Sequence, residues 1–546
     1  MSRSHIWSFF TKKGMDKAQC NGCNKLFKFK NCSTSSLWYH LKTANNSCGL
    51  LISREKTLSN MFKPCIGYCL SKILVEDNVP IHRMHKSNIL ADFLTKNGHK
   101  MPSSKTSISD KVIEFYNIHK TKLTIKIKSL LESGVRFNLS VDEWSSPVLH
   151  RYLSVILYYG DKNINLGLKL ISGELSGENV HYQIKEFLVE FGLSLTNHIL
   201  SQTFDGASYM LTYGKFANIP QIICINHTLH LSVLKCLEVY DVEEKDINKV
   251  SLVKKVRSIV HTFKKSPKLS QYLEEYLARE APELKLRKLI MDCKVRWNSL
   301  FKMLERFVKL YSHIKQVYSE LNKEFNINEA ELHTLKTICI GLQAVEEYVL
   351  MFSSEKCTFI DANLAVIYLI DYLWSVNDIF SQNLSLCIKN YHKIRINKAL
   401  LSSIMYIHKA ETDDFYCSEM DHKKYLIDVF KRLYPDQILK RTDAPTSVIK
   451  DDIETTSFSE GLSQFLSSSK TKLECGQSTL SDILGMQNSP SISMFQKALD
   501  SIKPTSTSNE RTFSYTGSVC VPNRSSMSDD LLIAIVFLRY NVLIKA

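Results

Sequence analysis

The sequence lacks an apolar run long enough to cross a membrane. Its longest strongly apolar run is Leu531–Leu538, whereas a membrane-spanning helix needs roughly 20 such residues. The first residues contain Trp7, Phe9 and Phe10, which are too few to form the apolar part of a secretory signal. No internal repeat is evident. We therefore expect neither a membrane partner nor secretion.

A regular cysteine framework is also missing. The 15 cysteines are an odd number and follow no repeating spacing. Cysteines used in this way, without a secretory signal, are typical of a reducing compartment such as the cytosol or the nucleus. We therefore expect the thiols to be free or bound to a metal.

Acidic residues are scarce near the start of the chain. The whole sequence has 70 Lys and Arg against 55 Asp and Glu, a net charge of +15. Residues 1–60 contain ten Lys or Arg but only two acids, Asp16 and Glu55. A local basic surplus attracts polyanions, of which DNA is the commonest. A solvated basic surface is the alternative interpretation.

Hydrophobic periodicity predicts an α+β fold that is mostly helical. Alternating or dense apolar patterns predict five strands, near residues 137–141, 152–159, 164–171, 199–204 and 219–225. Helical patterns between and after the later strands predict a mixed sheet with helices packed on it. From about residue 245 to 440 we find only helical patterns. The stretch Ser463–Lys472 is rich in Ser and Thr, which predicts a linker or mobile loop.

Cysteine and histidine spacing predicts a zinc module in the first 50 residues. Cys20 and Cys23 have the C-x2-C spacing that lets two thiolates of one tight turn reach a single zinc ion. His40 follows on a short amphipathic pattern and supplies a third ligand. Asn45 stands where a second histidine is expected. The candidates for the fourth ligand are Cys48, Cys32 or no residue at all.

Three acidic residues occupy positions that suit metal-dependent chemistry. Asp142 ends the first predicted strand, Asp205 ends a later one, and Glu510 lies far downstream. Carboxylates at adjacent strand ends, joined by one from a helix, can hold two Mg²⁺ ions for phosphodiester chemistry. Each residue also has a structural interpretation. Asp205 followed by Gly is a common turn, Glu510 can form a capping box with Thr507, and Asp142 can be a polar strand end.

The start of the chain resembles a BED-type zinc finger. The residues that carry this resemblance are Trp7, Phe10, Phe27 and the stretch Ser36–Lys42. BED-type fingers bind DNA, so the resemblance implies the role that the charge suggests. It implies DNA contacts for Trp38 and Lys42.

Five short motifs occur in an order and at spacings that resemble the hAT superfamily of DNA transposases. They are Asp142–Ser145, Phe204–Ala207, Cys224–His227, Arg296–Ser299 and Asn509–Ser514. The end of the chain, with Tyr515–Gly517, Arg524 and Leu531–Asn541, is similar to the dimerisation region of the same superfamily. BED-type fingers commonly precede hAT cores, so the resemblance extends over nearly the whole chain.

The hAT resemblance implies a catalytic core. The core is expected to be an RNase H-like mixed α/β fold interrupted by a large all-helical insertion. Asp142, Asp205 and Glu510 are expected to be the catalytic DDE ligands of Mg²⁺ or Mn²⁺. Arg296 and Trp297 are expected near the DNA, where Trp297 can stack on a flipped base. A core aromatic is the alternative interpretation of Trp297.

The same resemblance assigns a family CxxH motif near the active site. Cys224 and His227 form this motif, and we expect them to pack and form hydrogen bonds more than bind metal. Further upstream, the segment Leu74–Met101 is similar to the helical DNA-binding and dimer-contact region of the superfamily.

The resemblance divides the chain into six segments. They are a BED-type zinc finger (1–52), a helical DNA-binding and dimer-contact region (60–135), the first part of an RNase H-like core (136–244), an all-helical insertion (245–442), a Ser/Thr-rich linker or mobile loop (443–490), and the end of the core with the C-terminal dimerisation region (491–546).

The function that follows is DNA transposition. We expect a nuclear protein that binds double-stranded DNA and itself, with zinc in the finger and Mg²⁺ or Mn²⁺ in the core. Its activity would be DNA cleavage and strand transfer. The alternative is a domesticated, catalytically silent zinc-finger protein that binds DNA as a transcriptional or architectural regulator.

Overall fold

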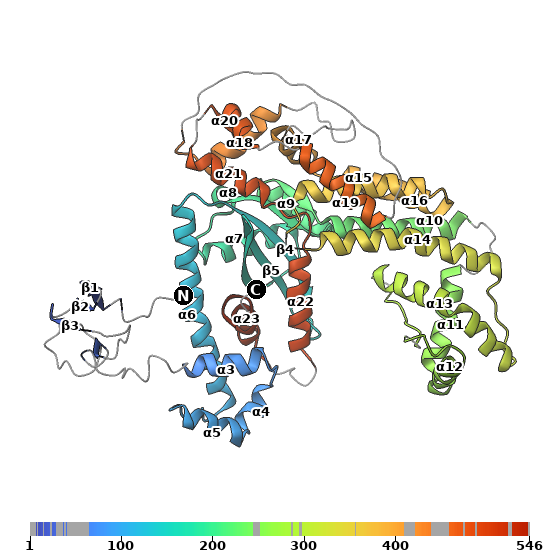
Figure 1. The fold of residues 1–546 in the computed structure, drawn as a ribbon, viewed down its shortest axis with the longest axis horizontal. Coiled ribbons are helices and arrows are strands. Elements are labelled where there is room, and N and C mark those ends of the chain that lie inside the picture. Colours follow the sequence, from blue (N-terminus) through green and yellow to red (C-terminus); the bar gives the residue numbers. More distant parts are fainter. Residues whose placement is uncertain are drawn as a thin grey trace. The chain divides into compact units, whose positions relative to one another are not determined.

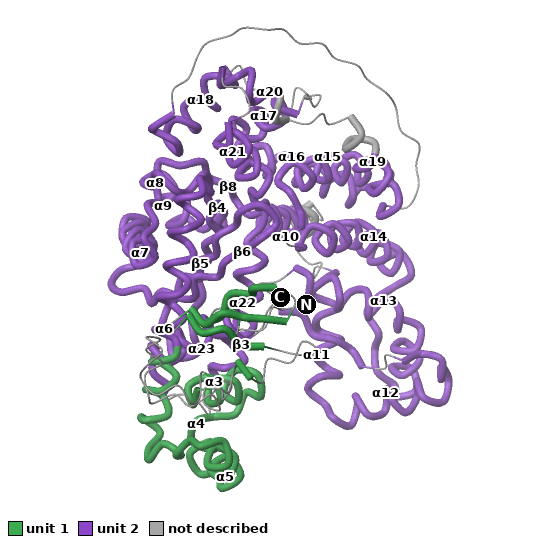
Figure 2. The backbone as a smooth tube through the Cα atoms, turned by 60° about the vertical axis from the view of Figure 1, so that its left-hand side comes forward, with its two compact units in different colours: residues 1–115 green, residues 116–546 purple. Residues whose placement is uncertain are grey.

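The computed structural model divides into two compact units, residues 1–115 and 116–546 (Figures 1 and 2). The structure describes residues 7, 9–14, 16–21, 24–28, 36–37, 40, 65–243, 252–285, 288–293, 297–354, 356–408, 421–437, 458–472, 476–485, 489–521 and 527–543. The division between the units falls inside helix α6 (Lys105–Glu132), after Phe115. The sequence pattern instead placed a boundary at residue 135.

Unit 1 begins with a three-stranded antiparallel sheet of order β1-β2-β3. Its strands are β1 (Phe10–Lys12), β2 (Lys17–Cys20) and β3 (Leu26–Lys28). The turn between β2 and β3 is tight, because the Asn24 amide donates to the Cys20 carbonyl at 2.9 Å. Asn24 has φ +58°, a left-handed conformation that Asn adopts more readily than most residues. The chain therefore reverses direction just after Cys20, the first cysteine of the predicted zinc module.

The rest of unit 1 is helical. It contains α3 (Ile66–Val75), α4 (Ile81–His85), α5 (Asn88–Lys96) and the first part of α6. Helix α3 passes very close to α6, since a Cβ on Gly67 would lie 2.7 Å from the Phe115 Cβ and 2.9 Å from the Lys111 carbonyl oxygen. A glycine is therefore required where these two helices touch.

Unit 2 contains a five-stranded mixed sheet of order β6-β5-β4-β7-β8 (Figure 1). The strands are β4 (Phe137–Ser145), β5 (Arg151–Tyr159), β6 (Lys162–Leu170), β7 (Ile199–Phe204) and β8 (Gln221–Ile223). β4, β5 and β6 pair antiparallel, while β7 pairs parallel with both β4 and β8. The five predicted strands are confirmed, and β8 is shorter than predicted. The prediction that Asp142 ends its strand is wrong, because pairing with β5 continues to Ser145.

Helices pack on this sheet. Helix α7 (Gly177–Val189) packs against α9 (Ser208–Ala217) and β6, and the short α8 (Leu195–His198) leads into β7. Near the end of the chain, α22 (Thr507–Val519) packs on β4 and β5, and α23 (Asp529–Leu538) packs on β6. A π-helical turn, Arg539–Leu543, follows α23. The sheet is thus completed by helices that are distant in sequence.

A large helical cluster shares one apolar core. Its members are α10 (Ile225–Glu243), α11 (Leu252–Lys265), α12 (Pro267–Glu280), α13 (Trp297–Glu320), α14 (Glu329–Phe352), α15 (Phe359–Ser375), α16 (Ile379–Arg395) and α19 (Phe458–Lys472). A second cluster has its own core. It consists of α17 (Lys398–Ile407), α18 (His422–Leu433), α20 (Gly476–Leu484) and α21 (Pro490–Asp500). The second core includes Leu200 of β7 and Ile222 of β8. Helices α17, α18, α20 and α21 therefore pack over the sheet, whereas α19 returns to the first cluster.

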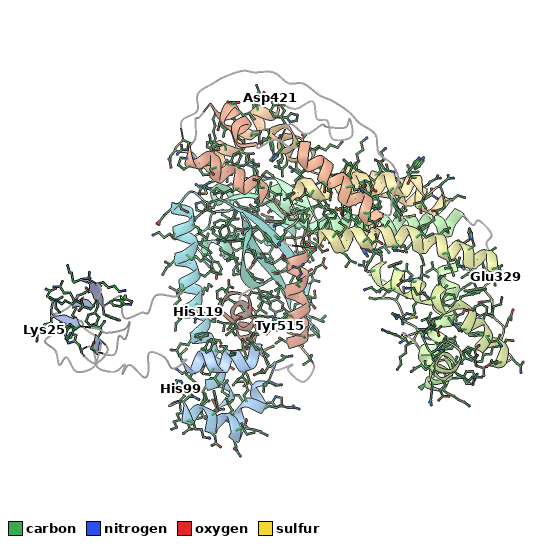
Figure 3. The ribbon with its side chains drawn as sticks, in the orientation of Figure 1. Lys25, His99, His119, Glu329, Asp421 and Tyr515 are labelled. Atoms are coloured by element: carbon green, nitrogen blue, oxygen red, sulfur yellow. The ribbon has the colours of Figure 1, made fainter. Side chains whose placement is uncertain are left out.

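Helix starts in these clusters follow local capping rules. At α14, Asn328 Oδ1 accepts from the Glu331 amide at 2.8 Å and Glu331 Oε2 accepts from the Asn328 amide at 2.9 Å, which is a capping box. At α18, Asp421 Oδ1 accepts from the Lys424 amide at 3.0 Å. Figure 3 labels Asp421 and Glu329 at these two helix starts. Short-range sequence signals are sufficient to begin both helices.

The prediction of a linker or loop at Ser463–Lys472, within 443–490, is wrong. These residues lie in α19, which has Phe458, Leu462 and Leu466 at helical spacing against the first core. Exposed serines in this helix donate to carbonyls one turn earlier, as Ser463 does to Ser459 at 2.8 Å. Serine-rich composition did not prevent a helix because one apolar stripe could be buried. Residues 438–457 lie outside the described residues.

The apolar helix near the end of the chain is confirmed and is buried. Ser528 caps α23 by accepting from the Leu531 amide at 3.4 Å. Apart from the half-buried Ile533, the side chains of Leu531–Leu538 are at most 3% exposed. Among the described residues, no helix combines the length and the hydropathy that crossing a membrane demands. Dimerisation through this region stays a prediction, and Arg524 lies outside the described residues.

Candidate active site

Two of the three predicted carboxylates belong to neighbouring parallel strands: Asp142 lies on β4, and Asp205 directly follows β7. In the pairing of β4 with β7, Ser140 is the partner of Thr203. Asp142 and Asp205 each follow two residues later, so the register brings them to the same edge of the sheet. Both side chains are half-buried.

Helix α22 brings the third carboxylate to this edge. Asn509 is fully buried, and its Nδ2 donates to the carbonyls of Ser140 at 3.3 Å and Ser154 at 2.8 Å. The Ser140 hydroxyl donates back to Asn509 Oδ1 at 3.0 Å. Because β4 and β5 hold Asn509 in this way, Glu510 begins the exposed face of α22 beside the same strands. The capping-box interpretation of Glu510 is not supported, since the N-cap is Ser506 and makes no side-chain capping bond.

The pKa of Asp142 responds to the charges of both other carboxylates. Burial raises the pKa of Asp142 well above its ordinary value, and the charges of Asp205 and Glu510 raise it further. Hydrogen bonds from the Glu143 amide, at 2.9 Å, and from Ser506 oppose that rise in the pKa of Asp142. Burial also raises the pKa of Asp205. Like charges crowded in a partly desolvated place favour a proton or a cation.

A fourth carboxylate, Glu143, lies beside them and was not singled out from the sequence. Its charge contributes to the raised pKa of Asp205. Glu143 Oε2 accepts from the Tyr209 hydroxyl at 3.0 Å, and Oε1 accepts from the Ser145 hydroxyl at 3.0 Å. Both of its oxygens are therefore engaged by hydroxyl donors. The only sequence signal was its place next to Asp142.

The donors fit a hard divalent cation. Carboxylate oxygens are the ligands that Mg²⁺ and Mn²⁺ prefer, and the raised pKa of Asp142 shows negative charge that a cation would neutralise. Among the described residues, however, no three His, Cys, Asp or Glu side chains lie close enough together to hold one ion. Binding of an ion here would therefore require side-chain rotation.

The CxxH motif fixes the start of α22. Cys224 is buried and its Sγ accepts from the Ser506 amide at 3.4 Å. Burial raises the pKa of the Cys224 thiol to about 11, so it stays a neutral thiol. Asn226 Nδ2 donates to the Thr507 hydroxyl at 3.1 Å. These bonds agree with the expected hydrogen-bonding role of Cys224 and hold α22 against the first turn of α10.

Comparisons with known proteins show which proteins the chain is similar to. Residues 222–340 match the family model of the ZBED1 RNase-like helical domain. The Hobo transposase of Drosophila melanogaster is 22% identical over 364 residues, which is 62% of this chain and 52% of that protein. A Talaromyces stipitatus protein named as a candidate transcriptional regulator, tpeD, is 27% identical over 229 residues, 35% of this chain and 27% of that protein. The chain thus spans between about a quarter and about half of the length of these relatives.

The chain is a relative of the hAT transposases.

In this hAT relative, Trp297 lies inside the helical core. Its side chain is 3% exposed and packs in the first apolar cluster, at the start of α13. The neighbouring Asn298 donates from Nδ2 to Glu346 Oε2 at 2.9 Å. The structure favours the core-aromatic alternative for Trp297, because a ring this buried has no free face for a base. Arg296 lies outside the described residues.

The zinc module of the hAT relative is described only in part. Cys20 is fully buried on β2. His40 stacks near Phe27, with ring centroids 4.2 Å apart, and burial and then Lys25 lower the pKa of His40. A histidine that stays neutral suits metal binding. The other predicted residues of this module, Cys23, Cys48, Trp38 and Lys42, lie outside the described residues.

Sequence reasoning also missed Arg395. It is the last residue of α16, and its charge opposes the burial-driven rise in the pKa of Asp205. Nothing in the local sequence marks it, because its place beside β8 and near Asp205 arises only in the folded chain.

Proposed function

We propose that this hAT relative binds double-stranded DNA and cleaves its backbone, with Asp142, Asp205 and Glu510 as ligands of Mg²⁺ or Mn²⁺. The observation that carries the proposal is the in-register position of Asp142 and Asp205, with α22 packed beside them. Two parallel strands joined to three antiparallel ones also support the RNase H-like core that the family resemblance implies.

The side chains at this edge have distinct tasks in such a reaction. Asp142, Asp205 and Glu510 would hold a divalent cation, which would supply activation of water or of a 3′-hydroxyl and stabilisation of the leaving oxygen. Asn509 and Cys224 keep α22 in place, so that Glu510 stays beside Asp142. The hydroxyls of Tyr209 and Ser145 occupy Glu143, which leaves the negative charge of the other carboxylates for the cation.

The finger and the end of the chain would serve DNA recognition and assembly. We propose that residues 1–52 bind zinc through Cys20, Cys23 and His40, with Cys48 as the fourth ligand, and contact DNA. The basic surplus in residues 1–60 supports this role. A nuclear location follows from the proposed function, and the two relatives are named as a transposase and a transcriptional regulator. Self-association through residues 491–546 completes the proposal.

A cleavage assay tests the catalytic proposal. The full chain, saturated with zinc, is incubated with Mg²⁺ or Mn²⁺ and a duplex that carries the repeats flanking its own gene. Asp205→Asn should abolish cleavage while DNA binding is retained. Asp161→Asn, which removes an exposed acid between β5 and β6, is the matched control and should cleave normally. Cleavage that survives in Asp205→Asn would overturn the assignment of the carboxylates.

The second candidate is a catalytically silent DNA-binding regulator. Asn45 in place of the expected histidine and the relative named for transcriptional regulation favour it. In that case the wild-type chain binds duplex DNA but does not cleave it with either metal. Removal of zinc by a chelator should weaken DNA binding under both proposals. An affinity for DNA that the chelator does not change would contradict the role of the finger.

A further inference from the structure

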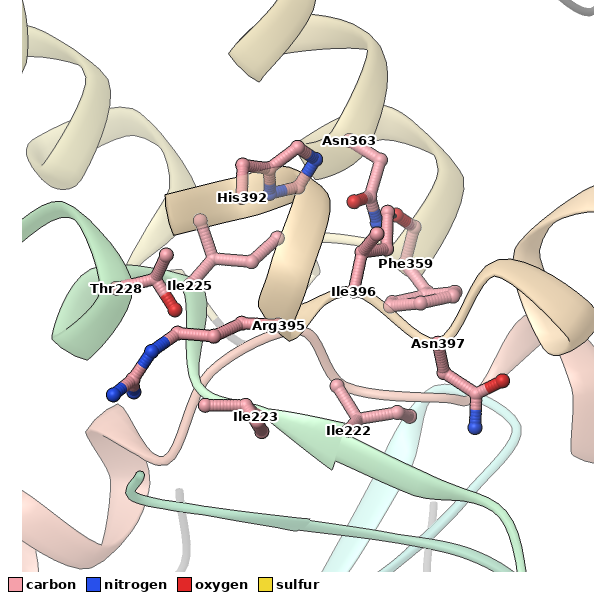
Figure 4. A pocket seen from close by; sticks show the side chains of 10 residues that line it. All are labelled: Ile222, Ile223, Ile225, Thr228, Phe359, Asn363, His392, Arg395, Ile396 and Asn397. Carbon is pink, nitrogen blue, oxygen red and sulfur yellow. Dashed lines mark hydrogen bonds between the residues drawn. The ribbon is translucent and has the colours of Figure 1, made fainter. Parts of the chain in front are cut away.

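The end of α16 reaches the edge of the sheet that carries Asp205. Arg395 lines a pocket together with Ile225 and Thr228 of α10. Figure 4 shows its guanidinium group extending away from Asn397, toward the start of α10. The charged end of the side chain therefore points toward the CxxH motif and the catalytic edge.

Three observations place the guanidinium group beside the catalytic residues. Burial and then the charge of Arg395 lower the pKa of His227, and the same charge acts on the pKa of Asp205. Any side chain at Gly206 would collide with the guanidinium nitrogens. Only glycine at this position lets Arg395 come so close to the backbone that follows Asp205.

This cation is incompletely satisfied. Arg395 Nη1 is buried and makes no hydrogen bond within the described part of the chain. A buried cationic donor without a partner is unfavourable. A cation near the end of a helix also interacts favourably with the helix dipole, but Lys393 in the same last turn does so from an exposed position. The helix dipole alone therefore does not explain why Arg395 Nη1 is buried.

We propose that Arg395 is a binding site for a phosphate of the DNA backbone at the catalytic edge. The proposal rests on the DNA-processing function proposed above and adds a residue from the helical region to it. The planar guanidinium presents paired donors that match two phosphate oxygens, which lysine cannot do. A phosphate held here lies next to Asp205, where the backbone must be positioned for cleavage.

The salt dependence of DNA binding tests the contact without any need for catalysis. Binding of the flanking-repeat duplex is measured by fluorescence anisotropy at several NaCl concentrations, with Ca²⁺ in place of Mg²⁺. For one lost phosphate contact, the slope of log affinity against log salt should become shallower by about 0.9. Arg395→Gln should show this loss, and Arg395→Lys should keep the slope. Lys393→Gln is the matched control and should also keep it.

A second measurement changes the DNA in place of the protein. Single phosphates at the repeat end are replaced one at a time by neutral methylphosphonates. The wild-type chain should bind at least one of these duplexes more weakly than the unmodified duplex. Arg395→Gln should bind that same duplex and the unmodified one with equal affinity. This double-mutant cycle isolates the pair, and circular dichroism and the thermal midpoint show whether the variants fold.

The outcomes separate this inference from the proposed function. If Arg395→Gln keeps the wild-type slope and every methylphosphonate affects both proteins equally, Arg395 serves only the fold and the inference is wrong. If the wild-type chain binds but does not cleave with Mg²⁺, the catalytic proposal fails while a reduced slope still supports the phosphate site. If the wild-type chain does not bind the duplex at all, both are overturned. In a cleaving protein, Arg395→Gln should lower the rate by about 10²–10³-fold, as loss of one preorganised donor does.

Discussion

Helices α22 and α23 both begin with acids in their first turn, but they use them in opposite ways. At α23, the Tyr152 hydroxyl donates to Asp529 Oδ1 at 2.5 Å and His150 Nδ1 lies 2.9 Å from the same oxygen. Burial opposes ionisation there, yet these hydrogen bonds lower the pKa of Asp529. At α22, Glu510 adds charge beside Asp142, whose pKa is raised. The hydrogen bonds of Asp529 stabilise the start of α23. At α22, the charge of Glu510 repels that of Asp142, and a bound cation would reduce this repulsion.

The position of an acid near a helix N-terminus therefore does not indicate its role. The helix dipole favours both acids equally. What differs is the neighbouring group, which is a hydroxyl and an imidazole for Asp529 and the Asp142 carboxylate for Glu510. Four experiments test this difference between the starts of α22 and α23.

The largest effect on stability is expected at α23. Asp529→Ala should lower the free energy of unfolding by about 3 kcal/mol, because two hydrogen bonds to a charged group contribute about 1.5 kcal/mol each. Chemical denaturation measures this change. Asp530→Ala, in the same helical turn but exposed, should cost less than about 0.5 kcal/mol. Equal losses at both positions would mean that only the helix dipole matters.

Metal addition should affect the other helix start. With zinc already bound, Mn²⁺ at a hundredfold excess over its dissociation constant should stabilise the wild-type chain by about 2.7 kcal/mol. The thermal midpoint should rise accordingly, and a chelator should reverse the rise. Asp205→Asn should show a much smaller rise. A rise of equal size in that variant would locate the metal elsewhere in the molecule.

Removing a charge from the proposed catalytic edge should make the metal-free protein more stable. Asp142→Asn keeps an oxygen that can accept from the Glu143 amide but removes the repelling charge. The free energy of unfolding should rise by about 0.5–2 kcal/mol, the usual gain when a functional site loses its strain. Asp161→Asn should leave stability unchanged. A loss of stability in Asp142→Asn would show that its negative charge is already compensated without metal.

The smallest effect is a pH dependence. A raised pKa means that the folded chain binds the Asp142 proton more tightly than the unfolded chain does. The destabilisation caused by ionised Asp142 is therefore fully present above its folded-state pKa. It disappears as the pH falls toward the ordinary pKa of an aspartate. The stability advantage of Asp142→Asn should shrink over the same interval. For Asp529, whose pKa is lowered, stability is instead lost at still lower pH. An advantage that stays constant with pH would contradict the raised pKa.

Local patterns predicted most of the elements. The alternation that marks Phe137–Val141 and the dense apolar run Tyr152–Tyr159 predicted two strands at the centre of the sheet. Ser528 with two acids after it predicted the start of α23. These signals depend on residues a few positions apart. Composition failed at Ser463–Lys472, where three apolar residues at helical spacing outweighed the serines.

Local patterns were sufficient to predict the strand that contains Asp142 and the strand that Asp205 follows, because strand patterns are properties of the chain. The order of the motifs grouped these two acids with Glu510 as predicted metal ligands. Only the tertiary structure decided which residues surround them. Asn509 fixes Glu510 by bonding to two strands, Arg395 arrives from a separate helical cluster, and Trp297 lies in a core. Each of these outcomes depends on contacts between residues far apart in the sequence. Such contacts form only when whole apolar faces are buried together, so no local pattern encodes them.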